Sequence, residues 1–343
     1  MSQLDSITSP LTPAYEPLAP RSIEETGLNL GFLTELALKI MYFEGYLSGS
    51  QIADRMKLPF TGVVDQVLEF LKREQMAEVK GSGGFGEQAY QYAISMKGRE
   101  KAREALDRSQ YAGAAPVTLQ TYIAAMAHQS LKGFTVHQRG MRQALGHMVL
   151  NDRTFSQIGP AVNSGRSIFL YGPPGDGKTT IAEAVGAMIL NGDISVPYAI
   201  EVDGAIIKVF DQSNHERVAK QATSALKNRD LRWVKVHRPV IITGGELTLE
   251  TLDLVWDEVN NYYQAPYQMK ANGGMFLIDD FGRQQVRPRD LLNRWILPLE
   301  KRVDYLTLHT GRKIEIPFDV LIVFSTNLAP KDLVDEAFLR RIR

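Results

Sequence analysis

The stretch Ser167–Thr180 (SIFLYGPPGDGKTT) constrains the fold of this chain more than any other. Its apolar start predicts a short buried strand, Gly172 opens a glycine-rich loop, and Thr180–Leu190 has the pattern of a helix. The loop matches G-x-x-x-x-G-K-[ST] in the strand–loop–helix context that this motif requires, which a chance glycine-rich turn would lack. The sequence therefore predicts a phosphate-binding loop in an α/β domain.

Each part of this loop has a physical role. Glycines let backbone N–H groups surround phosphate oxygens, and the helix N-terminus adds the positive end of its dipole. We expect Lys178 to reach the β- and γ-phosphates of ATP and the Thr179 hydroxyl to hold Mg²⁺. The residues predicted to bind the nucleotide are Gly172, Pro173, Pro174, Gly175, Asp176, Gly177, Lys178, Thr179 and Thr180. ATP and Mg²⁺ are the expected ligands, and ATP hydrolysis is the expected activity.

Composition narrows the class of protein further. The 343 residues suggest two domains, and equal totals of 39 basic and 39 acidic side chains provide no overall positive field for nucleic acid. The absence of cysteine excludes disulfides and cysteine-based zinc sites. No apolar run reaches about 18 residues and no signal peptide is recognisable, so we expect a cytoplasmic protein.

The N-terminal third divides into an arm and a small domain. Residues 1–27 are polar and proline-rich, which predicts a disordered or extended arm, with a short docking segment as the alternative. Residues 28–108 show three helical segments, a hairpin from Ala77–Lys80 to Gln88–Ile94, and a last helix at Lys97–Asp107. Ser48 or Ser50 can cap the second helix. The third helix has Pro59 in its first turn and an apolar stripe of Val63, Val64, Val67, Leu68 and Leu71. This order of elements resembles a winged helix of the α+β class.

A winged helix can read DNA or dock proteins. Its third helix carries Asp65, Glu69 and Glu74 against Lys72 and Arg73, whereas phosphate contacts require an excess of basic side chains. We therefore favour protein docking and keep DNA binding as the alternative.

The rest of the chain is a linker, 109–118, and a core with its helical lead-in, 119–343. Asp203-Gly204 predicts a hairpin turn within Val196–Phe210, and Val240–Thr243 predicts a second core strand followed by a helix near Leu247–Leu254. The later elements expected are a helix at Pro288–Leu299, a hairpin at Val303–Phe318 and a buried strand at Val320–Asn327.

Acidic and amide side chains follow two of these buried strands. Met275–Asp280 (MFLIDD) ends in two carboxylates, and the carboxyl ends of parallel strands meet at one edge of a sheet. We expect Asp279 to hold Mg²⁺, Asp280 to polarise the attacking water, and Asn327 to bond the γ-phosphate or that water. The alternatives are a strand-end cap for the acids and a turn residue for Asn327.

The order of four motifs, GPPGDGKT, MFLIDD, FSTN and EAFLRR, resembles the AAA+ ATPase superfamily over about Leu150–Arg343. VIITGGELT and YYQAPYQMKANGG look like its MoxR-type and sigma-54-activator-like branches. The resemblance implies a five-stranded parallel sheet between helices, in a homo-oligomeric ring that is usually a hexamer, with ATP between subunits. Together with the winged helix, the chain looks like a bacterial AAA+ group whose substrate we do not name.

The resemblance also implies residue roles. By this resemblance, Lys178 and Thr179 are the Walker A residues and Asp279 and Asp280 are the Walker B residues. Asn327 is the sensor 1 residue. Arg341 or Arg340 becomes a trans-acting arginine finger; a solvated basic helix end is the alternative. Two departures stand out, because the second Walker B acid is usually glutamate and the printed chain ends before the helical lid. We therefore expect a truncated chain, whose ring assembly and turnover are in doubt.

Three functions remain in view. The first is a motor or chaperone-like ATPase that remodels a protein partner, with Tyr262, Tyr263 and Tyr267 contacting it or, alternatively, packing internally. The second is an ATP-dependent DNA-binding regulator that uses the winged helix. The third is a nucleotide-gated switch with slow hydrolysis.

Overall fold

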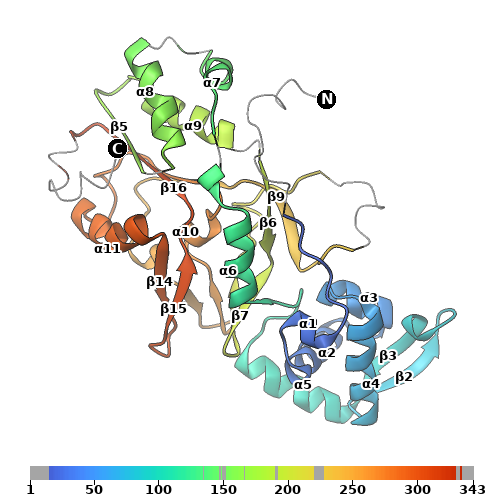
Figure 1. Cartoon of the computed structure of the whole chain (residues 1–343). Helices are drawn as coiled ribbons and strands as arrows, with labels where there is room; N and C mark the ends of the chain where they lie inside the picture. The colour runs from blue at the N-terminus through green and yellow to red at the C-terminus, as the bar shows by residue number, and fades with distance from the viewer. Residues whose placement is uncertain are drawn as a thin grey trace.

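A computed structural model describes residues 15–133, 135–146, 148, 152–165, 167–189, 192–219, 228–329 and 333. Figure 1 shows a small N-terminal unit, in blue, beside a larger α/β body that contains the remaining described elements. Among the described residues, no helix combines the length and apolar character needed to cross a bilayer. The predicted arginine finger, Arg340 or Arg341, lies outside the described residues.

The N-terminal unit contains the predicted helices and hairpin, together with two elements that were not predicted: the short helix Ile23–Thr26, inside the expected arm, and the short strand Leu47–Ser48. Its elements are α1 (Ile23–Thr26), α2 (Leu30–Glu44), β1 (Leu47–Ser48), α3 (Gly49–Met56), α4 (Asp65–Arg73), β2 (Ala77–Ser82), β3 (Tyr90–Ile94) and α5 (Met96–Arg108). The three strands form one antiparallel sheet in the order β1-β3-β2. Ser48 begins α3 with a capping box to Gln51, which confirms the predicted helix start.

The third helix begins later than its sequence suggests. Pro59 was expected in its first turn, but Thr61 and Gly62 depart from helical backbone angles and the regular helix α4 starts at Asp65. Gly62 has φ +83°, and a Cβ there would lie 2.3 Å from the carbonyl oxygen of Arg21. The close approach of the N-terminal segment therefore requires glycine and breaks the helix. The predicted apolar stripe is buried: Val63, Val64, Val67, Leu68 and Leu71.

A buried ion pair joins the N-terminal segment to the larger body. Arg232 and Asp230 are both 3% exposed and bond through several oxygen and nitrogen atoms, among them Nη2 to Oδ2 at 2.9 Å. The second guanidinium nitrogen donates to the carbonyls of Thr26 and Pro116. Arg232 thereby connects α1 and the segment 109–118 to β9 (Trp233–His237), the strand that begins directly after Arg232.

The central sheet contains four described parallel strands in the order β10-β13-β16-β5. Their bounds are β5 (Ile168–Tyr171), β10 (Val240–Thr243), β13 (Met275–Ile278) and β16 (Leu321–Thr326). A fifth strand was expected, and the described residues contain none in this sheet. Alternate residues of β13 face opposite sides: Phe276 and Ile278 pack with Trp295, whereas Met275 and Leu277 pack with Ile181. The sheet is therefore buried on both faces, as its apolar strands predict.

Helices cover both faces of this sheet. Helix α9 (Lys178–Ile189) packs on one face together with α7 (Gln138–Ala144) and α8 (Asp152–Asn163), and α11 (Pro288–Lys301) packs on the other. The predicted helix at Pro288–Leu299 is confirmed. Helix α8 was not predicted, because Gly159-Pro160 interrupts its pattern. Gly159 lies against α7, where a Cβ would come within 2.6 Å of the Met141 sulfur.

A second sheet lies between the N-terminal unit and the central sheet (Figure 1). Its order is β11-β12-β8-β7-β4, formed by β4 (Val117–Thr118), β7 (Ala199–Val202), β8 (Ala205–Lys208), β11 (Val255–Asp257) and β12 (Tyr262–Gln264). Helix α6 (Leu119–His128) and the hairpin β14 (Val303–Thr307)–β15 (Lys313–Pro317) share its core. Strands β6 (Asp193–Pro197) and β9 (Trp233–His237) form a separate antiparallel pair, and α10 (Tyr267–Lys270) precedes β13.

Both predicted hairpins of this region are confirmed. Asp203-Gly204 connects β7 to β8, and β14 pairs with β15 over their full length. The prediction of a helix near Leu247–Leu254 is wrong, because this segment forms only a single 3-10 turn, at Glu250–Leu252.

Candidate functional site

The phosphate-binding motif lies at the carboxyl edge of the central sheet, between β5 and α9. Gly175 has φ +89° and Gly177 has φ +74°, both in the left-handed region that favours glycine. A Cβ at Gly177 would also approach the Met148 methyl group to 3.3 Å. Lys178 is the first residue of α9, so the loop leads directly into a helix N-terminus. This backbone has the shape that directs N–H groups toward an anion.

The Lys178 ammonium crosses this loop. It donates to the carbonyl oxygen of Pro173 at 2.8 Å and to that of Gly172 at 3.1 Å. The Lys178 ammonium therefore lies beside the first residues of the loop. In this motif the lysine binds the β- and γ-phosphates, and that contact stays a prediction for Lys178.

Thr179 and Asp279 meet although 100 residues separate them. The threonine hydroxyl lies 3.2 Å from Oδ2 and 3.3 Å from Oδ1 of the carboxylate. Hydroxyl and carboxylate oxygens are the ligands that Mg²⁺ prefers, usually with substrate phosphates completing its shell. The two residues predicted to hold the metal are therefore adjacent, and their donor set fits Mg²⁺.

Asp280 occupies a tight turn directly after β13. Its φ is +50°, which is unusual for a residue other than glycine, and its side chain is exposed. Its backbone N–H donates to the Asp279 carboxylate at 3.1 Å, and the N–H of Asp279 donates to Thr243 at the end of β10. Both predicted acids thus stand at the carboxyl edge, beside the end of a second strand.

Sequence reasoning missed the side chains that surround this acidic turn. The Thr326 hydroxyl, 1% exposed at the end of β16, donates to the Phe281 carbonyl at 2.6 Å. The Gln284 side chain bonds the backbone of the same turn. Gln284 belongs to none of the four motifs, and Thr326 stands in FSTN, where only Asn327 was given a role, so the folded chain reveals both contacts.

Asn327 immediately follows β16 and is half-buried. Because β16 lies between β13 and β5, this places Asn327 between the acidic turn and the phosphate loop along the sheet edge. Asn327 thus lies at the end of a buried strand, and its contact with phosphate or water stays a prediction.

The three tyrosines considered for partner contact pack within the chain. Tyr263 is 1% exposed, the Tyr267 ring lies against Phe276, and the Tyr262 ring meets Tyr111 edge-on. These contacts favour the packing alternative.

A polar cluster joins the loop after β8 to α10. Asp211 accepts from Lys270 at 2.8 Å, from the Ser213 N–H and from Asn214. Burial would raise the pKa of Asp211, but these donors outweigh it and hold that pKa well below its usual range. Burial lowers the pKa of His215, whose ring accepts from the Asp211 N–H and bonds the Lys270 carbonyl. The cluster is a structural support, and the described residues hold no group of three or more acids and histidines that could bind a metal.

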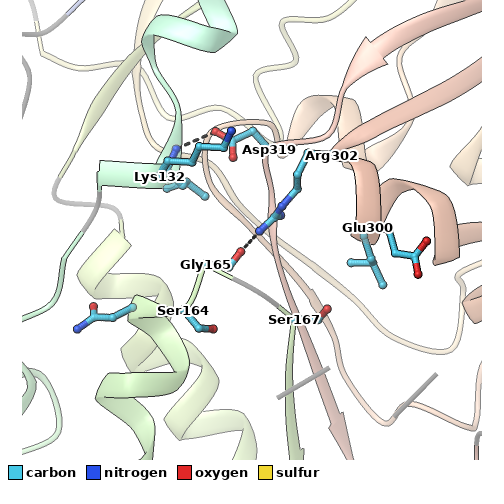
Figure 2. Close-up of a pocket in the computed structure, with 10 residues that line it drawn as sticks. Lys132, Ser164, Gly165, Ser167, Glu300, Arg302 and Asp319 are labelled. Carbon is cyan, nitrogen blue, oxygen red and sulfur yellow. Dashed lines mark hydrogen bonds between the residues drawn. The ribbon is translucent and has the colours of Figure 1, made fainter. Parts of the chain in front are cut away.

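A cavity of about 480 Å³ lies at the opposite, amino edge of the sheet (Figure 2). Ser167 lines it just before β5, and Asp319 lines it just before β16. Arg302 points into it from the end of α11 and bonds the carbonyl of Gly165. Because phosphates bind at the carboxyl edge, this cavity is not the nucleotide site.

Comparison with known proteins yields distant structural likenesses. No protein-family model and no curated protein matches the chain. One likeness is to NtrX from Brucella abortus crystallised with ATP, at 15% identity and TM-score 0.31, covering 57% of this chain and 35% of that one. Another is to the BchI–BchD complex of magnesium chelatase, at 16% identity and TM-score 0.37, covering 56% of each chain. The chain thus spans between about a third and just over half of these proteins.

A third likeness is to NtrX from Brucella abortus crystallised with ADP, at 15% identity and TM-score 0.32, covering 71% of this chain and 45% of that one. TM-scores this low carry no weight in the assignment. The function of this chain is therefore inferred from its own residues.

Proposed function

We propose that this protein is a Mg²⁺-dependent ATPase of the AAA+ type. The observation that carries the proposal is the meeting of Thr179 and Asp279 beside a glycine loop that begins a helix. Two motifs that are 100 residues apart in sequence supply adjacent oxygen ligands at one edge of a parallel sheet. A chance match to either motif would not require this convergence.

The residues divide the work of phosphoryl transfer to water. The N–H groups of Gly175 and Gly177 and the Lys178 ammonium bind the phosphates and offset the charge that grows on them. Thr179 and Asp279 would hold Mg²⁺, which neutralises negative charge on the β- and γ-oxygens when bound. Asp280 accepts a hydrogen bond from the attacking water and orients it. Asn327, between the two loops, bonds the same water or the γ-phosphate.

Assembly into a ring is part of the proposal. An arginine at position 340 or 341 would act on the nucleotide of a neighbouring subunit, and a fifth strand would extend the four described ones. Such a site is complete only between subunits, so turnover per subunit should rise with protein concentration.

The N-terminal unit is proposed to be a winged-helix-like domain that docks a protein. Phe85, at the tip of the hairpin between β2 and β3, is fully exposed, and Phe43 and Tyr46, at the end of α2 and just before β1, are more than half exposed. The exposed face of α4 mixes Glu69 with Lys72 and Arg73. Exposed aromatic side chains with balanced charge favour a protein surface over a phosphate backbone.

The test is steady-state ATP hydrolysis per subunit measured against protein concentration. Lys178→Ala should abolish turnover, and Arg341→Ala should abolish its rise with concentration. If Lys178→Ala hydrolyses ATP like the parent protein, the ATPase assignment is wrong. If turnover is independent of concentration and insensitive to Arg341, the ring with a trans-acting arginine is wrong while the ATPase stands.

A further inference from the structure

We propose that Gln284 is a positioning residue for hydrolysis, which holds the backbone of both acids in their working geometry. The inference rests on the proposed function and assigns a role to a side chain that belongs to no nucleotide-binding motif. Gln284 lies between the acidic turn and helix α11, and it is partly buried.

The Gln284 amide makes three hydrogen bonds to one turn. Its Nε2 donates to the carbonyl oxygen of Asp279 at 2.8 Å and to that of Asp280 at 3.2 Å. Its Oε1 accepts from the N–H of Gly282 at 2.8 Å. A single side chain thus contacts the backbone of both acids and of the glycine that completes the turn.

Only one orientation of this amide satisfies all three bonds. The two carbonyl oxygens need a donor with two hydrogens, and the Gly282 N–H needs an acceptor. Glutamine provides both in a side chain of this length, because its amide carries one NH₂ group and one oxygen. Glutamate would lose the donors, and methionine would lose all three bonds at similar size.

The turn requires such support because its backbone is unusual. Asp280 has φ +50°, Gly282 has φ +108°, and the N–H of Arg283 bonds back to the Asp280 carbonyl at 3.0 Å. A residue other than glycine keeps a left-handed conformation only where its surroundings impose it. The Asp280 side chain is exposed, so its direction depends on this backbone rather than on packing. Gln284 therefore controls where the Asp280 carboxylate points.

Gln285 provides a matched control. It is the next residue and is exposed, and its backbone N–H bonds the Gly245 carbonyl through an atom that substitution of its side chain retains. The experiment compares Gln284→Met, Gln284→Glu and Gln285→Met with the parent protein. It measures kcat and KM for Mg·ATP, ATP affinity, thermal unfolding, and amide hydrogen exchange over residues 279–284 without nucleotide.

We expect Gln284→Met to lower kcat by about 10- to 100-fold, the range seen when a hydrogen-bonding partner of a metal or catalytic ligand is removed. ATP affinity should change by less than about twofold, because the phosphate loop is untouched. Exchange at 279–284 should accelerate. Gln285→Met should match the parent in all of these. Gln284→Glu should also be slow, because a carboxylate keeps the acceptor for the Gly282 N–H but loses both donors to the Asp279 and Asp280 carbonyls.

Two results would overturn the proposal: a Gln284→Met kcat within about twofold of the parent, or a lowered kcat with hydrogen exchange over 279–284 unchanged from the parent. Failure of the proposed function looks different. The parent and Lys178→Ala would then have the same rate, whereas exchange over 279–284 would still report whether Gln284 holds the turn.

Discussion

The phosphate loop and the acidic turn lie at the same edge of the sheet, yet they are held in different ways. The loop takes its shape from its own residues, with left-handed Gly175 and Gly177 and the Lys178 side chain folded across it. The acidic turn takes its shape from Thr243, Thr326 and Gln284, which come from two other strands and a following segment. A local motif thus shapes the loop proposed to bind phosphate, and a tertiary network holds the backbone of Asp280, the acid proposed to orient water.

This difference predicts that substitutions in the two regions separate affinity from rate. Changes in the loop should weaken ATP binding, because its N–H groups are the proposed phosphate contacts. Changes around the acidic turn should slow hydrolysis at nearly unchanged affinity. The predictions below test this separation, from the largest expected effect on turnover to the smallest.

Asp280→Asn should have the largest effect. It preserves size and tolerates the left-handed backbone, but the amide cannot accept a proton or orient water as a carboxylate does. We expect kcat to fall by about 100-fold or more while ATP affinity stays within about twofold. Steady-state kinetics and nucleotide titration check both. Equal loss of affinity and rate would show that the acidic turn also carries binding.

Gly177→Ala should lower ATP affinity rather than the rate of hydrolysis. A Cβ at φ +74° costs about 1–2 kcal/mol and meets the Met148 methyl at 3.3 Å, so ATP affinity should fall by about tenfold. Gly245→Ala is the control, because Gly245 is in an unstrained conformation and its nearest atom would be 3.8 Å away. Nucleotide titration compares the two. Unchanged affinity in Gly177→Ala would mean that the loop does not depend on its left-handed glycine.

Thr326→Val should slow turnover only severalfold while lowering stability. It keeps the shape of the side chain but removes the bond to the Phe281 carbonyl and the bond from the Leu328 N–H. Loss of these buried bonds should lower the free energy of unfolding by about 1–3 kcal/mol. Ser325→Ala, one residue away at 2% exposure, is the comparison. If Thr326→Val has the stability and rate of the parent, the Thr326 side chain does not help to hold the turn.

Lys39→Met should leave turnover unchanged, because Lys39 lies in the N-terminal unit. Its side chain is 5% exposed and bonds the Ser109 carbonyl, and burial lowers its pKa from 10.5 to about 8. Below pH 8 the folded protein carries a buried charge that opposes folding. Between about pH 8 and 10.5 the unfolded chain binds the extra proton, so stability rises with pH in this window.

We therefore expect Lys39→Met to stabilise the protein at pH 7 by up to about 3 kcal/mol, and this gain to shrink as the pH rises toward 10. Denaturant unfolding at several pH values measures it. A gain that is constant across this range would show that Lys39 carries no depressed pKa. A change in turnover would show that the N-terminal unit influences the site.

Local patterns predicted most of the described elements correctly. The strand, loop and helix around Lys178, the hairpin at Asp203-Gly204 and the cap at Ser48 all depend on residues close in sequence. Helix α8 was missed because its internal Pro160 reads as a break, although packing on α7 keeps the helix intact. The prediction of a helix after β10 was wrong in the opposite direction. The residues Leu247–Leu254 have a helical pattern, but they form only one 3-10 turn.

The sequence by itself determined the phosphate loop, the two acids and their place at strand ends, because glycine, lysine and carboxylate chemistry at fixed spacing leaves few other uses. Only the tertiary structure decided that Thr179 faces Asp279, that β16 lies between β13 and β5, and that Gln284 bonds both acids. Strand order and the partners of a buried amide depend on which surfaces pack together, and that packing is set by the whole chain rather than by any short stretch of it.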